Sequence, residues 1–314
     1  MTAGTHQETT PKPWRLVLSG GGTGGAFWMA GALEALAATG LDLASADLIV
    51  GTSAGALMGS VIALGGRPWD LASKVGSPGG GGLADASVRQ AALKRPAEFL
   101  RHRLMPSMGV RLSAAIGSLI PVGSHSTEHV EALVRDFITP GVRPHRGLRI
   151  STVERLSARR ILFGPELERL PNAVAASCAV PGWFVPVEID GAYYVDGGVH
   201  SNFSIDVAAD IYRAHVVVVS PLTGVVPRRR DAGWLAMGMA RRELRRLLRR
   251  EIRRAARVQA HIMVLEPGED EVLAMGLNLM DDSRGAELRQ LGLERTQKRL
   301  ADPAWQTMLG EIGG

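Results

Sequence analysis

Apolar residues near the start of the chain form short β-type runs that alternate with stretches of helical spacing. The run at 14–19 predicts a strand, and the spacing at 26–39 predicts a helix that ends at Gly40. A second strand ending at Val50 precedes a second helix at 54–64. Two consecutive strand–loop–helix units predict an α/β domain with a parallel sheet, and they bring both connecting loops to the same edge of that sheet.

The rest of the chain continues this pattern. Asp190 and Gly191 form the residue pair of a tight hairpin turn between two short strands. Further strands are expected at 148–153, 160–163, 187–189, 193–195, 215–220 and 261–265, and further helices at 171–178 and 287–300. The chain has 314 residues, of which 46% are hydrophobic, so it can bury one large core. We therefore expect a single α/β domain.

A glycine-rich stretch, 78–82, interrupts the α/β pattern and leads into helical segments at 86–137. Methionine, leucine and isoleucine side chains give these segments an apolar surface. Such a surface suits core packing, or it suits a mobile cap over a pocket for an acyl chain, because methionine adapts to irregular apolar ligands. We place the expected cap at about 77–137.

The cysteine content and the N-terminal residues bear on the cellular compartment in which the protein resides. The single cysteine, Cys178, excludes an internal disulfide and is expected to be a small core residue. Residues 1–13 are expected to form a disordered tail, and they lack the apolar segment of a secretory signal. No stretch reads as a transmembrane helix, because glycines and Asp47 interrupt the least polar one. These features lead us to expect a cytoplasmic protein.

Positive charge is concentrated in one segment of the chain. Between Arg228 and Arg257 there are twelve arginines and three acidic residues, so this segment carries +9 while the rest carries −4 of the total +5. Apolar residues recur at helical intervals within it, which predicts an amphipathic helix at 237–258 with a cationic face. Most such faces are only solvated, but this one also suits transient contact with anionic lipid at the inner face of a membrane. A nucleic-acid partner is not expected.

The second predicted strand leads into Gly51-Thr52-Ser53-Ala54-Gly55. In a G-x-S-x-G turn between a strand and a helix, the backbone is too crowded for side chains at the two glycine positions, and the serine hydroxyl is raised from the turn. The start of the following helix also favours an oxyanion beside Ser53. The spacing makes Ser53 a candidate nucleophile, although an incidental serine in a turn would look the same.

Glycines also follow the first predicted strand, at Gly20, Gly21, Gly22, Gly24 and Gly25. Three of them match the G-x-G-x-x-G dinucleotide fingerprint, and Asp42 or Asp47 would then be the ribose-binding acid. The same backbone could instead offer N–H groups to the oxyanion of a tetrahedral intermediate. Both interpretations place a ligand at this loop.

A hairpin strand ends at Asp196-Gly197-Gly198. An acid followed by two residues without side chains can approach another loop closely and take a proton from a serine, although Asp-Gly-Gly is also ordinary turn chemistry. His200 is the one histidine near this acid in the sequence, and we expect it to be a surface loop residue. The other candidate histidines, His215 and His261, begin strands.

Taken together, the glycine-rich loop, the Ser53 turn and the Asp196 loop occur in an order that resembles the patatin-like phospholipases. The segment Ala176-Ser177-Cys178-Ala179-Val180-Pro181-Gly182-Trp183-Phe184, which leads to the Asp196 loop, resembles the stretch before the catalytic aspartate of that family. The resemblance covers residues 14–210. It implies a three-layer α/β/α fold with a central, mostly parallel sheet.

The resemblance also implies roles for single residues. Ser53 would be the nucleophile and Asp196 the general base of a Ser-Asp dyad without a histidine. The elbow glycines Gly51 and Gly55 and the base-loop glycines Gly197 and Gly198 would shape the two turns. The loop of Gly20, Gly21, Gly22, Gly24 and Gly25 would supply the oxyanion hole, in which we assign the donor N–H groups to Gly21, Gly22 and Gly24.

The substrate implied by the resemblance is a lipid ester, with water as the second reactant and with no metal or cofactor. The catalytic domain would span 14–225, and an arginine-rich helix, a strand and a helix at 226–314 would complete it. Two positions depart from the family pattern. Gly24 stands where the family often has arginine or lysine, so the N–H groups must stabilise the oxyanion alone. The segment 201–204 lacks an expected proline, which affects packing more than chemistry.

Three alternatives remain at this point. A Ser-His-Asp esterase would use His200 or a later histidine, but its nucleophile turn would come unusually early in the chain. A nucleotide-binding protein would use the loop at 20–25 and would leave Ser53 and Asp196 without a role. A lipid-binding regulatory protein with weak catalysis would account for Gly24 and the arginine-rich helix.

Overall fold

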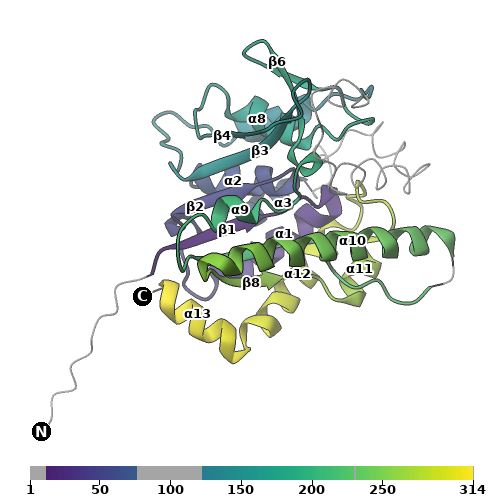
Figure 1. Ribbon diagram of the computed structural model, residues 1–314. Coiled ribbons are helices and arrows are strands. Elements are labelled where there is room, and N and C mark those ends of the chain that lie inside the picture. The colour runs from purple at the N-terminus through teal and green to yellow at the C-terminus, as the bar shows by residue number, and fades with distance from the viewer. Residues whose placement is uncertain (1–11, 76–121, 230, 314) are drawn as a thin grey trace, which may run out of the picture.

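A computed structural model of the protein describes residues 12–75, 122–229 and 231–313 (Figure 1). Its centre is a sheet in which the strands follow the order β5-β6-β3-β2-β1-β7-β8, with β4 also paired to β3. The strands are β1 (Trp14–Leu18), β2 (Leu48–Gly51), β3 (Leu148–Glu154), β4 (Arg160–Phe163), β5 (Val187–Ile189), β6 (Ala192–Asp196), β7 (His215–Val219) and β8 (His261–Leu265).

Most of the strand pairs are parallel. β1 pairs in parallel with β2 on one side and with β7 on the other, and β3 and β8 extend the parallel sheet outwards. The pairs of β3 with β4 and with β6, and the β5–β6 hairpin, are antiparallel. The strand order reverses at β1, so the loop after β1 lies at the switch point where open α/β sheets bind ligands.

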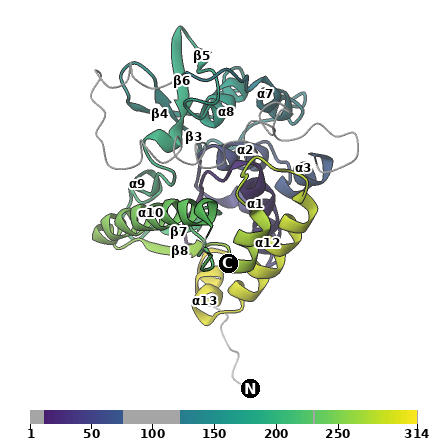
Figure 2. The ribbon, with the colours of Figure 1, turned by 90° about the vertical axis from the view of Figure 1, so that its right-hand side faces the viewer.

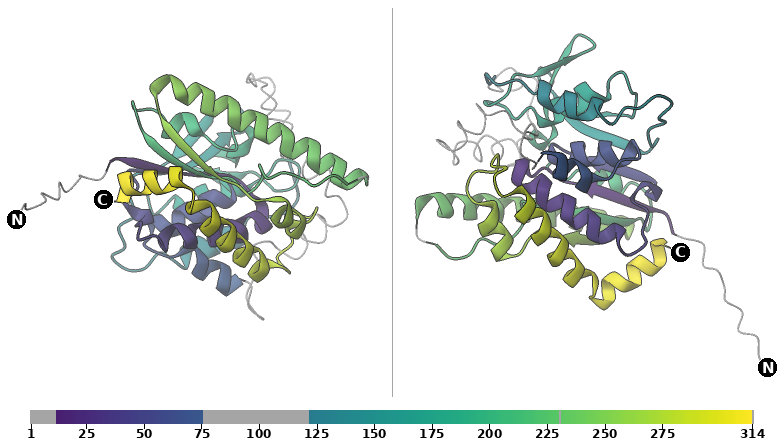
Figure 3. Two further views of the ribbon diagram at one scale, coloured as in Figure 1. Left: turned by 90° about the horizontal axis from the view of Figure 1, so that it is seen from below. Right: turned by 180° about the vertical axis from the view of Figure 1, so that it is seen from behind.

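Helices cover both faces of the sheet (Figures 2 and 3). One face packs against α1 (Gly22–Ala37), α2 (Ala54–Ala63), α3 (Pro68–Val75), α8 (Leu170–Cys178) and α12 (Gly285–Leu300). The other packs against α9 (Ile205–Ala208) and α10 (Ala232–Ala255), with the remaining helices α7 (Glu128–Arg135), α11 (Glu269–Met275) and α13 (Pro303–Gly313) around this frame. The expected three-layer α/β/α fold with a mostly parallel sheet is confirmed.

Alternating side chains of the buried strands supply both cores. In β1, Leu16 and Leu18 face the core under α1, whereas Val17 faces the core under α10. The same alternation divides the valines of β7, which explains why both strands read as continuous apolar runs. The C-terminal helices are part of this packing. A Cβ at Gly292 of α12 would overlap the carbonyl oxygen of Trp28 in α1, so these two helices cross at very short range.

The structure also differs from the pattern-based expectations. Helix α1 begins at Gly22 rather than at residue 26, because several of the glycines form its first turn instead of a loop. Helices α3, α9, α11 and α13 were not expected. The hairpin turn is confirmed, with φ of 50° at Asp190 and 79° at Gly191. Residues 1–11 of the expected tail and 77–121 of the expected cap lie outside the described residues.

No helix in the described part of the chain combines the length and the hydropathy that crossing a bilayer requires.

Candidate active site

Ser53 occupies a strained turn between β2 and α2. Its backbone angles are φ 54° and ψ −122°, and 4% of its surface is exposed to solvent. A non-glycine residue with positive φ costs free energy, and such strain is common at catalytic positions. Steric contacts explain why glycine stands two residues before and two residues after Ser53. A Cβ at Gly55 would overlap the carbonyl oxygen of Leu18, and one at Gly51 would lie 2.6 Å from the Cα of Ala56. The turn is therefore pressed against the end of β1.

The glycine loop follows β1 directly beside this turn, since Leu18 pairs with Gly51 across the two strands. A Cβ at Gly21 would lie 2.6 Å from the Cγ of Pro221, so the ring of that proline packs on the loop. Only Ser19, Gly20 and Gly21 connect the strand to α1, whose first turn begins at Gly22. The N-terminus of α1 is thus brought to the edge of the sheet where Ser53 lies.

One of the expected oxyanion donors already has a partner. The N–H of Gly24 donates a hydrogen bond to the carbonyl oxygen of Leu279 at 3.1 Å. That oxygen would also lie 2.6 Å from a Cβ at Gly22, so the segment around Leu279 covers the start of α1. Our assignment of the Gly24 N–H to the oxyanion therefore needs correction, and the amides of Gly21 and Gly22 are the remaining donors of that assignment.

Asp196 is the last residue of β6 and is 2% exposed. Its Oδ1 accepts the N–H of Gly198 at 2.7 Å, and its own N–H donates to the carbonyl oxygen of Ala179 at 3.0 Å. Gly197 packs on the carbonyl of Ser151, where a Cβ would overlap the oxygen. The backbone contact therefore requires glycine at position 197, whereas a Cβ at Gly198 would lie 3.0 Å from the Oδ1 of Asp196.

A serine that received no role from the sequence connects the nucleophile turn to the base loop. The N–H of Ser53 donates to the Oγ of Ser177 at 2.9 Å, and the hydroxyl of Ser177 donates to the carbonyl oxygen of Ser151 at 2.7 Å. Gly197 rests on that same carbonyl. The four residues form a buried chain of contacts from Ser53 to the residue that follows Asp196.

A cavity of about 50 Å³ opens beside Ser53. Its wall is mostly apolar and comes from α1, α2, α7, the segment 178–184 and the loop after α11. The lining residues are Gly22, Thr23, Ala26, Ser53, Ala54, Leu57, Thr127, His129, Val130, Cys178, Val180, Phe184 and Met280. Sequence reasoning missed His129 and Met280 as wall residues. Cys178, expected in the core, also lines this cavity.

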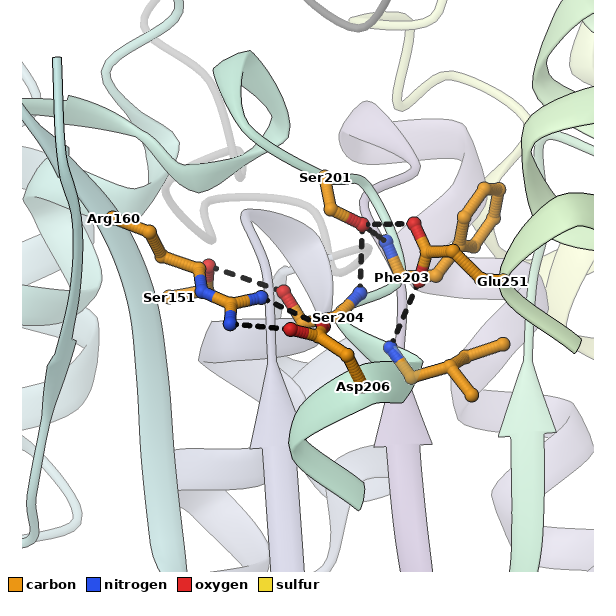
Figure 4. A network of polar contacts seen from close by, with 8 residues as sticks. Ser151, Arg160, Ser201, Phe203, Ser204, Asp206 and Glu251 are labelled. Atoms are coloured by element: carbon orange, nitrogen blue, oxygen red, sulfur yellow. Dashed lines mark hydrogen bonds and ion pairs between the residues drawn. The ribbon is translucent and has the colours of Figure 1, made fainter. Parts of the chain in front are cut away.

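The segment after the base loop is fixed by a polar network that includes α10 (Figure 4). The Oγ of Ser201 accepts the N–H groups of Phe203 and Ser204 at 3.1 and 2.8 Å, and its hydroxyl donates to Glu251 at 2.6 Å. The other oxygen of Glu251 accepts the N–H of Ile205 at 3.0 Å. Burial raises the pKa of Glu251, against the opposing effect of these two hydrogen bonds.

The positions of Asp42, Asp47 and His200 bear on the dinucleotide-binding and Ser-His-Asp alternatives. Asp42 caps the short turn Leu43–Ser45, and both it and Asp47 precede β2, whereas the glycine loop follows β1. Because β1 and β2 are parallel, these acids lie at the opposite edge of the sheet from the loop, so neither can be the ribose-binding acid of a dinucleotide site. His200 is exposed, as expected.

Within the described ranges, no group of three or more histidine, cysteine, aspartate or glutamate side chains is arranged to hold a metal ion.

One of three comparisons with known proteins assigns the chain to a family. The family model described as patatin-like phospholipase matches residues 16–209. No curated protein matches the chain. Among solved structures, the crystal structure of VipD from Legionella pneumophila matches with 14% sequence identity and a TM-score of 0.45, over 93% of this chain and 67% of that one. The family model spans more than half of the chain, from β1 to the end of α9, and the chain therefore belongs to the patatin-like phospholipases, a family of lipid acyl hydrolases.

Proposed function

We propose that this protein hydrolyses lipid esters through an acyl-enzyme, with Ser53 as the nucleophile and Asp196 as the general base. The observation that carries the proposal is the buried chain of contacts from the Ser53 amide through Ser177 and Ser151 to Gly197. This chain supports a fixed arrangement of the nucleophile turn and the base loop. Fixed geometry of this kind is what proton transfer from serine to carboxylate requires.

In the proposed reaction, Asp196 takes the hydroxyl proton of Ser53 as its Oγ attacks the ester carbonyl carbon. The tetrahedral intermediate carries its negative charge on the former carbonyl oxygen, which accepts the N–H groups of Gly21 and Gly22 near the N-terminus of α1. The intermediate collapses, the C–O bond to the alcohol breaks, and Asp196 returns the proton to the alcohol. A water molecule, deprotonated by Asp196, then attacks the acyl-enzyme. The C–O bond to Ser53 breaks, Asp196 returns the proton to the Oγ of Ser53, and the fatty acid is released.

The apolar wall of the cavity supports an acyl chain as the substrate group beside Ser53. Leu57, Val130, Val180, Phe184 and Met280 supply most of its large apolar side chains. Such a wall removes apolar surface of the ligand from water, which stabilises binding without requiring polar partners along the chain. A lipid acyl ester therefore fits this site better than a small polar ester.

We further propose that α10 brings the enzyme to anionic lipid at the cytoplasmic face of a membrane. Its outward face begins with the apolar residues Leu235 and Met239, which are 54% and 67% exposed. It then carries the exposed arginines Arg242, Arg246, Arg249, Arg250 and Arg253. Apolar side chains beside a row of arginines provide both the burial and the charge attraction that interfacial helices use.

The position of this face relative to the cavity supports the same proposal. A Cβ at Gly233, near the start of α10, would lie 2.7 Å from Leu277. Met280, three residues further along that segment, lines the cavity beside Ser53. A membrane that touched the apolar end of α10 would therefore lie near the loop that borders the site.

The test is labelling with an alkyl fluorophosphonate, followed by a panel of phospholipid, lysophospholipid and glyceride substrates. The wild type should be labelled and should release fatty acid, Ser53→Ala should do neither, and Asp196→Asn should lose turnover while it stays folded. Equal labelling of the wild type and Ser53→Ala would contradict the assignment. Liposome binding without hydrolysis of any substrate would favour a lipid-binding regulatory protein instead.

A further inference from the structure

Arg241 of α10 is buried in the core under the sheet, and 1% of its surface is exposed. It stands on the inner face of a helix whose other inward residues are mostly apolar, such as Met237, Leu244 and Leu248. Among the described residues, no carboxylate forms an ion pair with it. A buried charge without a carboxylate partner is costly, and a residue that only filled space there could be apolar.

The two hydrogen-bond acceptors of Arg241 both border the glycine loop. Its Nη1 donates to the carbonyl oxygen of Pro221 at 2.9 Å, and its Nη2 lies 3.5 Å from the Sδ of Met275. Pro221 begins the turn two residues after the end of β7, and Met275 ends α11. One guanidinium therefore ties together two segments that are more than fifty positions apart in the sequence.

Each of these partners supports the loop at a different point. A Cβ at Gly21 would lie 2.6 Å from the Cγ of Pro221, and one at Gly25 would lie 3.0 Å from the same atom. A Cβ at Gly24 would lie 4.0 Å from the Cγ of Met275. The residues that Arg241 holds are thus among those that pack against the loop.

The neighbouring Arg245 strengthens the same support. Its Nε and Nη2 both donate to the carbonyl oxygen of Thr223, at 2.9 and 2.7 Å. The hydroxyl of Thr223 contacts Ser220, whose Oγ lies 3.4 Å from that of Ser19 just before the glycine loop. Two successive inward arginines of α10 therefore fix the turn that packs behind the loop.

We infer that Arg241 is a positioning residue for the proposed acyl-transfer reaction: from behind the glycine loop it fixes Pro221 and Met275, and through them the backbone of residues 21–25 at the N-terminus of α1. The inference rests on the proposed function of that loop. Burial and the nearby Arg245 lower the pKa of Arg241 to about 9, so the guanidinium stays charged at neutral pH.

The test compares Arg241→Met with the wild type by two measurements. The first is the rate of inactivation by an alkyl fluorophosphonate together with kcat and KM for a soluble ester. We expect the inactivation rate and kcat to fall about 10- to 100-fold, the size found for residues that orient a catalytic group from behind, with KM changed less than about twofold. The second is amide hydrogen exchange of the peptide that covers residues 19–28, which should become faster in Arg241→Met.

Arg299→Met is the matched control, because Arg299 is an exposed arginine in the last turn of α12, outside the face of α10 proposed for membrane contact. It should leave both measurements at the wild-type level. If Arg241→Met does not fold, Arg241→Lys is used, and exchange of the loop peptide must still exceed that of the wild type. Unchanged exchange in a folded Arg241 variant would overturn the inference. A wild type that resists fluorophosphonate would instead contradict the proposed function, and the exchange comparison would still decide the role of Arg241.

Discussion

The amide nitrogen of Ser53 lies 2.9 Å from the hydroxyl oxygen of Ser177, and the N–H donates to it. The same hydroxyl donates its own hydrogen to the carbonyl of Ser151 on β3. The hydroxyl thus accepts from the nucleophile turn and donates to the strand that pairs with β6, which ends at Asp196. The distance between these two parts of the site therefore depends on a residue that takes no part in the chemistry.

Ser177→Ala should lower both stability and activity. The substitution leaves the Ser53 N–H and the Ser151 carbonyl without their buried partner, and each unsatisfied group costs about 1–3 kcal/mol. Ser60→Ala is the control, because the buried hydroxyl of Ser60 donates to the carbonyl of Leu57 in its own helix and, among the residues that the structure describes, joins no second element. Urea unfolding should show a clearly larger loss for Ser177→Ala, and ester turnover should fall only in that variant. Equal losses in the two variants would contradict the bridging role.

Gly55→Ala should disrupt the nucleophile turn. The added Cβ would overlap the backbone carbonyl of Leu18, which cannot move without distorting β1. We expect a loss of about 3 kcal/mol or more in the free energy of unfolding, in the range of severe core disruptions. Gly310→Ala is the control, since Gly310 lies in α13 with no atom near its Cβ position, and it should gain about 0.5–1 kcal/mol. Thermal unfolding of both variants tests the contrast.

Glu251 should make stability depend on pH. Burial raises its pKa in the folded protein above the ordinary value of 4.5, so the folded state holds this proton more tightly than the unfolded state. Its contribution to stability is therefore fully present below pH 4.5 and decreases as the pH rises through the folded pKa. The stability of the wild type relative to Glu251→Gln should fall over that interval in urea unfolding series.

Glu287 provides the opposite case. A hydrogen bond from Arg284 lowers the pKa of Glu287 in the folded protein. The contribution of Glu287 to stability is therefore present above its ordinary pKa and is lost as the pH falls through the lowered pKa. The difference between the wild type and Glu287→Gln should change with the opposite sign. If both differences ran in the same direction, the assigned cause of the Glu251 shift would be wrong.

His129 and His200 distinguish a Ser-Asp dyad from a triad. His129 lines the cavity beside Ser53, whereas His200 is exposed. Because the dyad uses no histidine, His200→Ala should keep kcat, and His129→Gln should change KM more than kcat. Loss of kcat by about 10²-fold or more in either variant, the size expected for a general base, would favour the triad. Steady-state kinetics with a soluble ester tests both.

The exposed face of α10 should govern binding to anionic vesicles. Replacing Leu235 and Met239 by serine should weaken binding to vesicles that contain phosphatidylserine, and replacing Arg242, Arg246 and Arg249 by glutamine should weaken it further and remove its salt dependence. Neutral phosphatidylcholine vesicles are the control for charge. Vesicle sedimentation of a Ser53→Ala background measures binding without hydrolysis. Binding that none of these changes affects would contradict the role proposed for α10.

The sequence alone determined the elements of the sheet, the hairpin at Asp190 and Gly191 and the order of the three site motifs. These features are local, since side-chain periodicity and turn residues act over a few positions. The Ser53 turn was also readable, because the G-x-S-x-G spacing between a strand and a helix is a local signal, although the carbonyl that excludes a side chain at Gly55 belongs to Leu18 of β1.

Only the tertiary structure decided which distant groups meet these motifs. Leu279 engages the Gly24 amide, Ser177 joins Ser53 to Ser151, and Arg241 supports the loop through Pro221. None of these contacts has a periodic signature, because each joins residues from separate elements whose approach depends on how helices pack on the sheet. The parallel pairing of β1 and β2 likewise excluded Asp42 from a site at the glycine loop, because it places the start of β2 far from the loop after β1.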